Sequence, residues 1–150
     1  DLLQYKTSQS TAEAYTARKV LYFEIFDNTV RRYRQFFSLP YSANTGYKAP
    51  IFFELLEEGK MTLLAREALE YRTYSSPYSY GSYTRLVLVN NYFLLKENGD
   101  IEPYLGKKRS DLLELMGKKA DKVEKFIKTN NLKVDEKYDL VRIVEYYNSI

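Results

Sequence analysis

The sequence predicts an α+β fold, with a mostly antiparallel β-sheet of about six to seven strands followed by two or three C-terminal helices. Three observations predict it. Short apolar segments separated by turn residues fill residues 1–106, and several alternate with period two. A Glu-Gly pair and an Asn-Gly pair mark tight hairpins within that region. From residue 107 onward, the apolar spacing changes to the helical period.

Composition bounds the size and class of the protein. A chain of 150 residues, 45% of them hydrophobic, is long and apolar enough for one folded domain. We therefore expect a single domain over 1–150, with a β-rich body at 1–106 and a helical part at 107–150. The net charge is +3, and the excess lies in the helical part, which carries 11 basic and 8 acidic residues. This excess is too small to indicate nucleic acid.

Several kinds of chemistry are excluded by composition. The chain contains neither cysteine nor histidine. Disulfides, cysteine or histidine zinc sites, thiol nucleophiles and the Ser-His-Asp triad are therefore absent. No apolar run approaches the ~20 residues of a membrane span. We expect no cofactor and no metal.

Strands are predicted in order along the body. Residues 1–7 form a short strand, and residues 8–14 form a loop. Residues 19–27 are apolar on both faces, which predicts a central strand. Residues 30–39 carry three arginines, which favours an exposed strand near an edge. Pro40 is expected to end it.

Two hairpins follow. Residues 51–57 and 60–72 flank Glu58-Gly59, and the turn favours a strand over a helix for the second segment. Residues 85–96 and 101–105 flank Asn98-Gly99, which predicts a type I′ turn with positive φ at both residues.

The helical part has clear boundary signals. Ser110 is the expected N-cap of the first helix, Gly117 is expected to interrupt the pattern, and Asn131 can end it. Asp135 is expected to cap the last helix. The apolar face of that helix consists of Leu140, Ile143, Val144 and Tyr147.

A resemblance to known proteins rests on five segments. They are residues 19–27, 52–60, 92–99, 107–113 and 139–148, the last of which ends in Tyr-Tyr-Asn. Their order resembles a group of uncharacterised bacterial cell-envelope proteins. Members of that group have an export signal and further N-terminal strands, so we expect this chain to be trimmed at its N-terminus. No activity is attached to the group, so the resemblance implies export and no functional residue.

The candidate binding residues lie in the biased segment 71–84. Its tyrosines alternate with serine, glycine and proline, a mixture that suits binding loops. The alternative is a long hairpin connection whose tyrosines fold back onto the sheet. The candidate residues for a ligand or partner are Tyr71, Tyr74, Tyr78, Tyr80 and Tyr83.

Other clusters are better explained without a site. Glu54, Glu57 and Glu58 are interpreted as solvated hairpin charge rather than a catalytic acid pair. Asn98 to Asp100 is interpreted as a turn rather than a calcium loop. The stripe of Lys118, Lys119, Lys122 and Lys125 is interrupted by acids, which favours a solvated helix face.

The leading hypothesis is a non-enzymatic binding or structural module of the bacterial envelope, periplasmic or secreted, with a cytoplasmic location left open. Its partner would be a protein or a carbohydrate, and nucleic acid is disfavoured. One alternative is a carbohydrate-active or other hydrolytic enzyme that uses two carboxylates about 5–10 Å apart. Another is a binder of anionic lipid or nucleic acid through the C-terminal helices.

Overall fold

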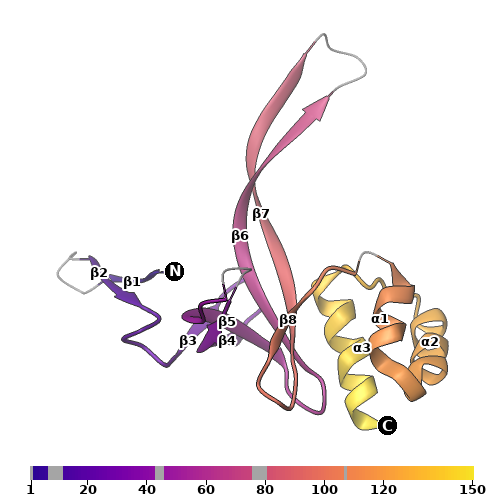
Figure 1. Ribbon diagram of the computed structural model, residues 1–150. Helices are drawn as coiled ribbons and strands as arrows, with labels where there is room; N and C mark the ends of the chain where they lie inside the picture. Colours follow the sequence, from indigo (N-terminus) through magenta and orange to yellow (C-terminus); the bar gives the residue numbers. More distant parts are fainter. Residues whose placement is uncertain (1, 7–11, 43–45, 76–80, 107) are drawn as a thin grey trace.

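The computed structural model describes residues 2–6, 12–42, 46–75, 81–106 and 108–150. Within these residues the fold is α+β, as the sequence predicts. A six-stranded antiparallel sheet follows chain order from β3 to β8, and β1 and β2 pair separately (Figure 1). The strands are β1 (Leu2–Lys6), β2 (Ala12–Thr16), β3 (Tyr22–Asp27), β4 (Arg32–Tyr41), β5 (Ala49–Glu57), β6 (Thr62–Ser75), β7 (Ser82–Leu95) and β8 (Ile101–Tyr104).

Two predictions about the first strands are wrong. Residues 12–14, predicted as loop, belong to β2, whose pairing with β1 raises the strand count above the predicted six to seven. Pro40 does not end its strand, because β4 runs on to Tyr41 and Pro40 lies opposite Pro50 of β5. Proline is tolerated in a strand where its missing N–H is not needed by the ladder.

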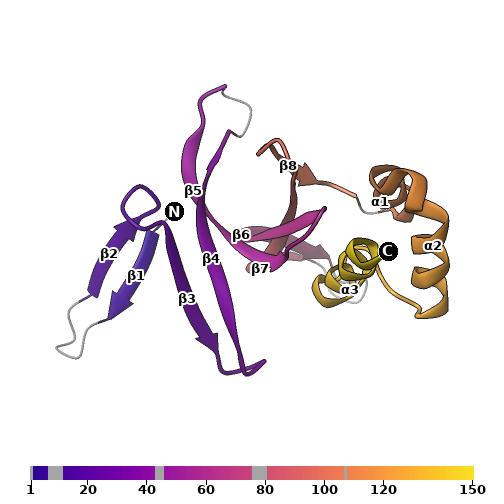
Figure 2. The same cartoon turned by 90° about the horizontal axis from the view of Figure 1, so that it is seen from below.

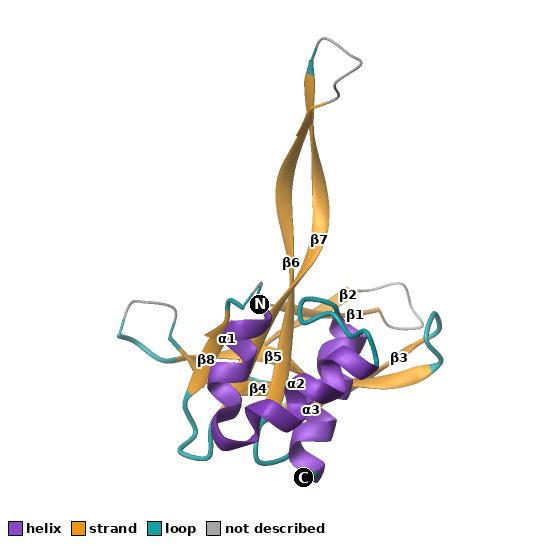
Figure 3. Cartoon of the chain, turned by 90° about the vertical axis from the view of Figure 1, so that its right-hand side faces the viewer, coloured by secondary structure: helices purple, strands orange, loops and turns teal. Residues whose placement is uncertain are grey.

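The helices cover one face of the sheet (Figure 3). They are α1 (Arg109–Met116), a 3₁₀ turn (Gly117–Lys119), α2 (Ala120–Thr129) and α3 (Lys137–Ser149). The predicted break at Gly117 is confirmed, since its φ of 53° lies in the left-handed region that glycine adopts easily. Asn131, with a φ of 51°, marks the turn after α2.

Both predicted N-caps are wrong. Ser110 lies inside α1 and its hydroxyl bonds to the Asp111 carboxylate, while the N-cap is Lys108, which makes no side-chain cap bond. The N-cap of α3 is Glu136, also without such a bond. The acid that orders this region is Asp139, whose carboxylate accepts the Lys133 N–H at 2.9 Å and so fixes the preceding loop.

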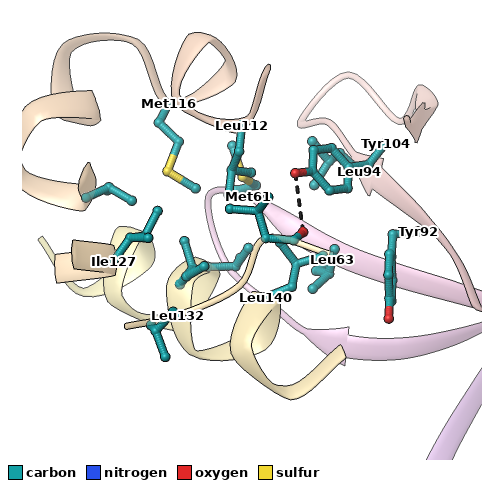
Figure 4. Packing of buried hydrophobic residues seen from close by; sticks show 14 of the residues in the cluster. Met61, Leu63, Tyr92, Leu94, Tyr104, Leu112, Met116, Ile127, Leu132 and Leu140 are labelled. Atoms are coloured by element: carbon teal, nitrogen blue, oxygen red, sulfur yellow. Dashed lines mark hydrogen bonds between the residues drawn. The ribbon is translucent and has the colours of Figure 1, made fainter. Parts of the chain in front are cut away.

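The main core lies between the sheet and the helices (Figure 4). Leu63 and Leu94 from β6 and β7 pack under Leu112 of α1 and Leu140 of α3. The predicted apolar face of α3 is confirmed: Ile143 and Val144 are fully buried, and Leu140 nearly so. The Tyr104 hydroxyl donates to a carbonyl of the loop before α3 at 3.4 Å. This packing makes the helical part a cover for the lower part of β6 and β7.

A smaller core occupies the opposite face. The rings of Tyr41, Phe53 and Phe93 meet edge to face, with centroids 5.1 to 5.7 Å apart. β5 pairs with β6 only over Glu54–Glu57, whereas its residues 49–55 pair with β4. The first part of β5 is therefore separate from β6, and a register shift between Leu55 and Glu57, as at a β-bulge, adds local twist. The sheet therefore curls upon itself, as Figure 2 shows from below.

The prediction that residues 19–27 form a central strand is wrong. Within the described residues, β3 pairs with β4 alone and forms one edge of the six-stranded sheet. Its apolar side chains are partly open to solvent, with Ile25 and Phe26 each 46% exposed. An apolar strand at an edge is unusual, because such edges attract other strands.

The turn at Asn98-Gly99 also differs from the prediction. Gly99 has a φ of 84°, but Asn98 is not among the described residues with positive φ, so the turn is not type I′. Gly99 N–H bonds to the Lys96 carbonyl and Lys96 N–H to the Asp100 carbonyl, both at 2.9 Å. This pattern indicates a type I turn followed by a left-handed glycine, the other common hairpin solution for these residues.

The β6–β7 hairpin is the longest feature of the fold. Each strand has 14 residues, and the hairpin rises well beyond the rest of the sheet (Figure 1). Most of the segment 71–84, predicted as a loop, is therefore strand. We call residues 66–75 and 82–91 the arm, and the part of β6 and β7 below it the base.

Candidate interaction surface

The arm is a two-stranded ribbon whose strands pair only with each other in the described structure. β5 pairs with β6 no further than Ala65, and β8 pairs with β7 no further than Tyr92. From Arg66 and Asn91 outward, neither outer edge of the ribbon has a neighbouring strand among the described residues. A two-stranded hairpin is only marginally stable in water unless something packs on it.

One face of the arm carries an uncovered apolar patch. Cross-strand register places Leu69 opposite Leu88 and Tyr71 opposite Leu86. Alternation along β6 and β7 puts these four side chains on the same face as Leu63 and Leu94, which the helices bury. Their exposed fractions are 63%, 60%, 79% and 47% in the order named. We call Leu69, Tyr71, Leu86 and Leu88 the arm patch.

The arm patch has a polar border at each end. Above it, the hydroxyls of Thr73 and Thr84 bond to each other at 2.8 Å. Below it, Glu67 lies opposite Asn90, one row beyond the covered pair of Ala65 and Tyr92. An apolar patch with a polar rim is typical of a surface that contacts another macromolecule.

A charged cluster marks the boundary between base and arm. Arg34 of β4 binds Glu54 of β5 with two hydrogen bonds, Nε to Oε1 at 2.9 Å and Nη2 to Oε2 at 2.7 Å. The same Nη2 reaches Glu67 Oε1 at 2.6 Å. Lys137, the first residue of α3, binds both oxygens of Glu54 at 2.9 and 3.0 Å. The cluster joins three strands to the last helix.

The interpretation of Glu54 as a solvated hairpin charge is wrong. Its side chain is only 6% exposed, and those of Arg34 and Lys137 are 18% exposed. Burial by itself raises the pKa of the Glu54 carboxyl, but the bonds from Arg34 and Lys137 outweigh burial and lower that pKa below its usual value. The hydrogen bond to Glu54 in turn raises the pKa of Arg34. Glu54 is therefore a charged carboxylate shared by two cations.

A groove of about 650 Å³ lies beside this cluster. It runs between β4, the start of α3 and the lower end of the arm patch, and Leu88 belongs to both groove and patch. Arg32 lies over the Tyr138 ring at 5.6 Å and forms part of the groove wall. The apolar patch and the groove therefore form one continuous surface.

The five predicted tyrosines do not form one group. Tyr71 belongs to the arm patch, whereas Tyr74 and Tyr83 stack on the opposite face with ring centroids 5.5 Å apart. Arg85 covers the Tyr74 ring at 4.7 Å. Tyr78 and Tyr80 lie outside the described residues. Since Tyr74 already contacts an arginine and another tyrosine, the arrangement is less suited to stacking on a sugar.

Three members of the arm patch were missed by sequence reasoning. The alternation of Leu69 and Tyr71 with charged neighbours was visible, and so was the apolar run that contains Leu86 and Leu88. Both were interpreted only as strands of a hairpin. Nothing local to these residues indicates that no helix covers them.

The structure does bring two acids together, as the enzyme hypothesis requires. Glu54 and Glu67 both bind the Arg34 guanidinium and line a pocket of about 190 Å³. A general acid needs a raised pKa, whereas that of Glu54 is lowered. Burial raises the pKa of Tyr92 and Tyr104 to about 12, so neither hydroxyl ionises near neutral pH. The pair is better suited to holding the fold together.

The lysine stripe is also partly engaged within the protein. Lys119 Nζ donates to the carbonyls of Tyr147 at 3.1 Å and Ile150 at 2.6 Å, at the C-terminal end of α3. Lys118, Lys122 and Lys125 are exposed. An anionic surface would therefore meet three lysines of this stripe rather than four.

Comparisons with protein-family models, curated proteins and solved structures find no match to this chain. In the part of the chain that the structure describes, no group of three or more acidic side chains could hold a metal ion. No helix among the described residues is long and apolar enough to cross a membrane.

Proposed function

We propose that this chain is a non-enzymatic protein-interaction module that binds a partner through the arm patch. The observation that carries the proposal is the change along one sheet face. At the base, helices bury this face. Beyond the base lies a polar row, Glu67 and Asn90, and beyond that row lie four exposed apolar side chains. Patches of a few hundred Å² with a polar rim are commonly functional.

The proposed occupant is an amphipathic helix of another protein. The protein's own helices cover the same face at the base, so a partner helix would extend an existing layer. Successive rows of the patch lie about 7 Å apart along the strands, close to the ~5.4 Å pitch of a helix. One apolar helical stripe could therefore contact both rows. The four patch residues are uncharged and Glu67 at their lower border is acidic, which disfavours nucleic acid and anionic lipid as ligands of the patch itself; the basic side chain of Arg32 lies in the adjoining groove.

The test places a photo-reactive amino acid at position 71, on the patch, or at position 83, on the opposite face of the arm. Both tyrosines are exposed, at 79% and 56%, so they form a matched pair. In cells that produce the chain, we expect a discrete protein adduct from position 71 and none from position 83. Equal adducts from both positions, or none, would contradict the proposal.

The partner recovered in this way is then purified for an affinity measurement. We expect Leu88→Ser to weaken its binding at least tenfold with little change in melting temperature, because Leu88 is exposed in the free protein. The control Tyr83→Ser should retain the affinity of the unmodified chain. A loss of affinity that comes only with loss of folding would count against the patch.

The location in the bacterial envelope, periplasmic or secreted, stays a prediction supported by the resemblance described above. Fractionation of producing cells tests it independently of the arm patch. We expect the full-length protein in the periplasm or the medium, and a cytoplasmic fraction alone would refute export.

A further inference from the structure

A second surface, independent of the arm patch, lies at the β3 edge of the sheet. Successive residues along a strand direct their backbone N–H and C=O groups to opposite sides. Leu21, just before β3, faces β4, because its carbonyl accepts the Ser38 N–H at 2.8 Å. In an antiparallel ladder this pairing repeats every second residue, so Phe23 and Ile25 also direct their backbone groups toward β4. The N–H and C=O groups of Tyr22, Glu24 and Phe26 therefore point outward.

The two edges of the six-stranded sheet differ in their protection. β8 has four residues, includes Pro103, and carries Glu102 in an ion pair with Lys96 at 2.7 Å. Short length, proline and charge are the usual devices that prevent a strand from adding to an edge. β3 is longer, at six residues, has no proline, and exposes Phe26 by 46%; its charges are the acids Glu24 and Asp27. The β3 edge therefore lacks two of the three devices that protect β8, the short length and the proline.

Among the described residues, the segment before β3 turns away from this edge. β2 precedes β3 by five residues, a connection short enough for a hairpin. Instead, Lys19 and Val20 N–H groups bond to the Thr16 carbonyl, and Ser38 Oγ donates to the Ala17 carbonyl at 2.5 Å. Ala17 is 4% exposed, so this bend is anchored against β4. The bend directs β2 to pair with β1 rather than with β3 (Figure 2).

The charge of Glu24 favours a strand of a different protein over the β3 strand of a second copy as the partner of this edge. An antiparallel pairing of two β3 strands that uses all three outward residues places Glu24 directly opposite Glu24 of the other copy. Like charges in directly opposed positions destabilise strand pairing. A different strand with a basic residue opposite Glu24 and apolar residues opposite Tyr22 and Phe26 would be favourable at all three positions.

We propose that the β3 edge binds an extended segment of another protein by antiparallel strand addition, with a lysine or arginine opposite Glu24. Backbone bonds to the three outward residues provide the affinity, and the charge pair selects the register. Gln35 Nε2 donates to Glu24 Oε1 at 2.9 Å, and the Tyr22 hydroxyl bonds to the same oxygen. These two bonds hold the carboxylate on the sheet face where a basic side chain would meet it.

The probe is a nine-residue peptide with lysine at its centre, valine two positions to either side and threonine elsewhere; a second peptide has glutamate at its centre. Fluorescence anisotropy measures binding to the purified chain. We expect the lysine peptide to bind at least threefold more tightly than the glutamate peptide, and Glu24→Lys to reverse the preference. The control Glu102→Lys, at the protected edge, should leave the preference unchanged.

A second variant tests the backbone. Glu24→Pro removes an outward N–H without removing a bond to β4, so we expect it to weaken peptide binding at least tenfold. A circular-dichroism melt checks whether Glu24→Pro is folded. If this variant is unfolded, the reversed peptide preference of Glu24→Lys tests the proposal. Absence of binding by either peptide, or equal binding of both, would overturn the proposal. Dimerisation of the chain that strengthens in Glu24→Gln would assign the edge to a second copy and also overturn it.

Discussion

The base and the arm of the β6–β7 hairpin carry leucine and tyrosine side chains on the same face, but in opposite environments. Leu63 at the base is fully buried, whereas Leu69, six residues further along the same face of β6, is 63% exposed. Three devices hold the base: the apolar cover of the helices, the charged cluster at Glu54, and a clamp between Asn148 and Met61. None of the three reaches the arm patch. Coverage, rather than residue type, separates a core from a binding surface here.

The largest expected effect compares the two leucines directly. Leu63→Ala should lower the free energy of unfolding by ~2–5 kcal/mol, since it leaves a cavity under the helices. Leu69→Ala should change it by less than ~0.5 kcal/mol, as exposed substitutions usually do. Urea unfolding of both variants measures the difference. Similar losses would mean that the arm patch is covered within the protein itself, and would remove the proposed site.

The second prediction concerns the boundary cluster. Glu54→Gln should destabilise the protein by about 3 kcal/mol at pH 7, because it leaves Arg34 and Lys137 without their shared carboxylate. The pKa of Glu54 is lowered in the folded state, so its contribution is present above its usual pKa of 4.5 and is lost as the pH falls below it. The difference between the two proteins should therefore shrink in acid.

Unfolding by urea at pH 7 and at pH 3 checks this pH dependence. Glu58→Gln, at an exposed acid of the neighbouring turn, serves as the control and should have almost no effect at either pH. A loss at Glu54 that is independent of pH would show that its shape rather than its charge holds α3 to the sheet.

The smallest predicted effect tests the clamp at the other end of α3. The Asn148 side chain bonds to both backbone groups of Met61 at 3.0 Å, and a Cβ at Gly59 would lie 2.4 Å from Asn148 Nδ2. Gly59→Ala should displace that side chain and cost ~1–2 kcal/mol. In a double-mutant cycle, Gly59→Ala should add little once Asn148→Ala is present. Additive losses would indicate that the two residues act separately.

The wrong prediction of a central strand at residues 19–27 shows that apolar composition does not by itself determine whether a strand is buried. Apolar residues on both faces are typical of a central strand, and the same pattern occurs at β3, an edge. Glu54 shows the reverse error. An acid near a turn is expected to be exposed to solvent, yet Glu54 is buried and its negative charge is balanced by Arg34 and Lys137. In both cases the decisive neighbour is distant in sequence; Lys137 lies 83 residues from Glu54.

Local signals in the sequence were enough to determine the fold class, the hairpin order from β5 to β8, the break at Gly117 and the buried face of α3. Strand and helix periods, turn pairs and glycine each act over a few residues, so they can be read without a structure. Of the arm patch, only Tyr71 was predicted. Alternation shows that Leu69 and Leu63 share a face, but only tertiary structure decides that the helices end between them. The reason is geometric: the length of a strand is set by its own residues, whereas its cover is set by elements that join the fold elsewhere in the chain.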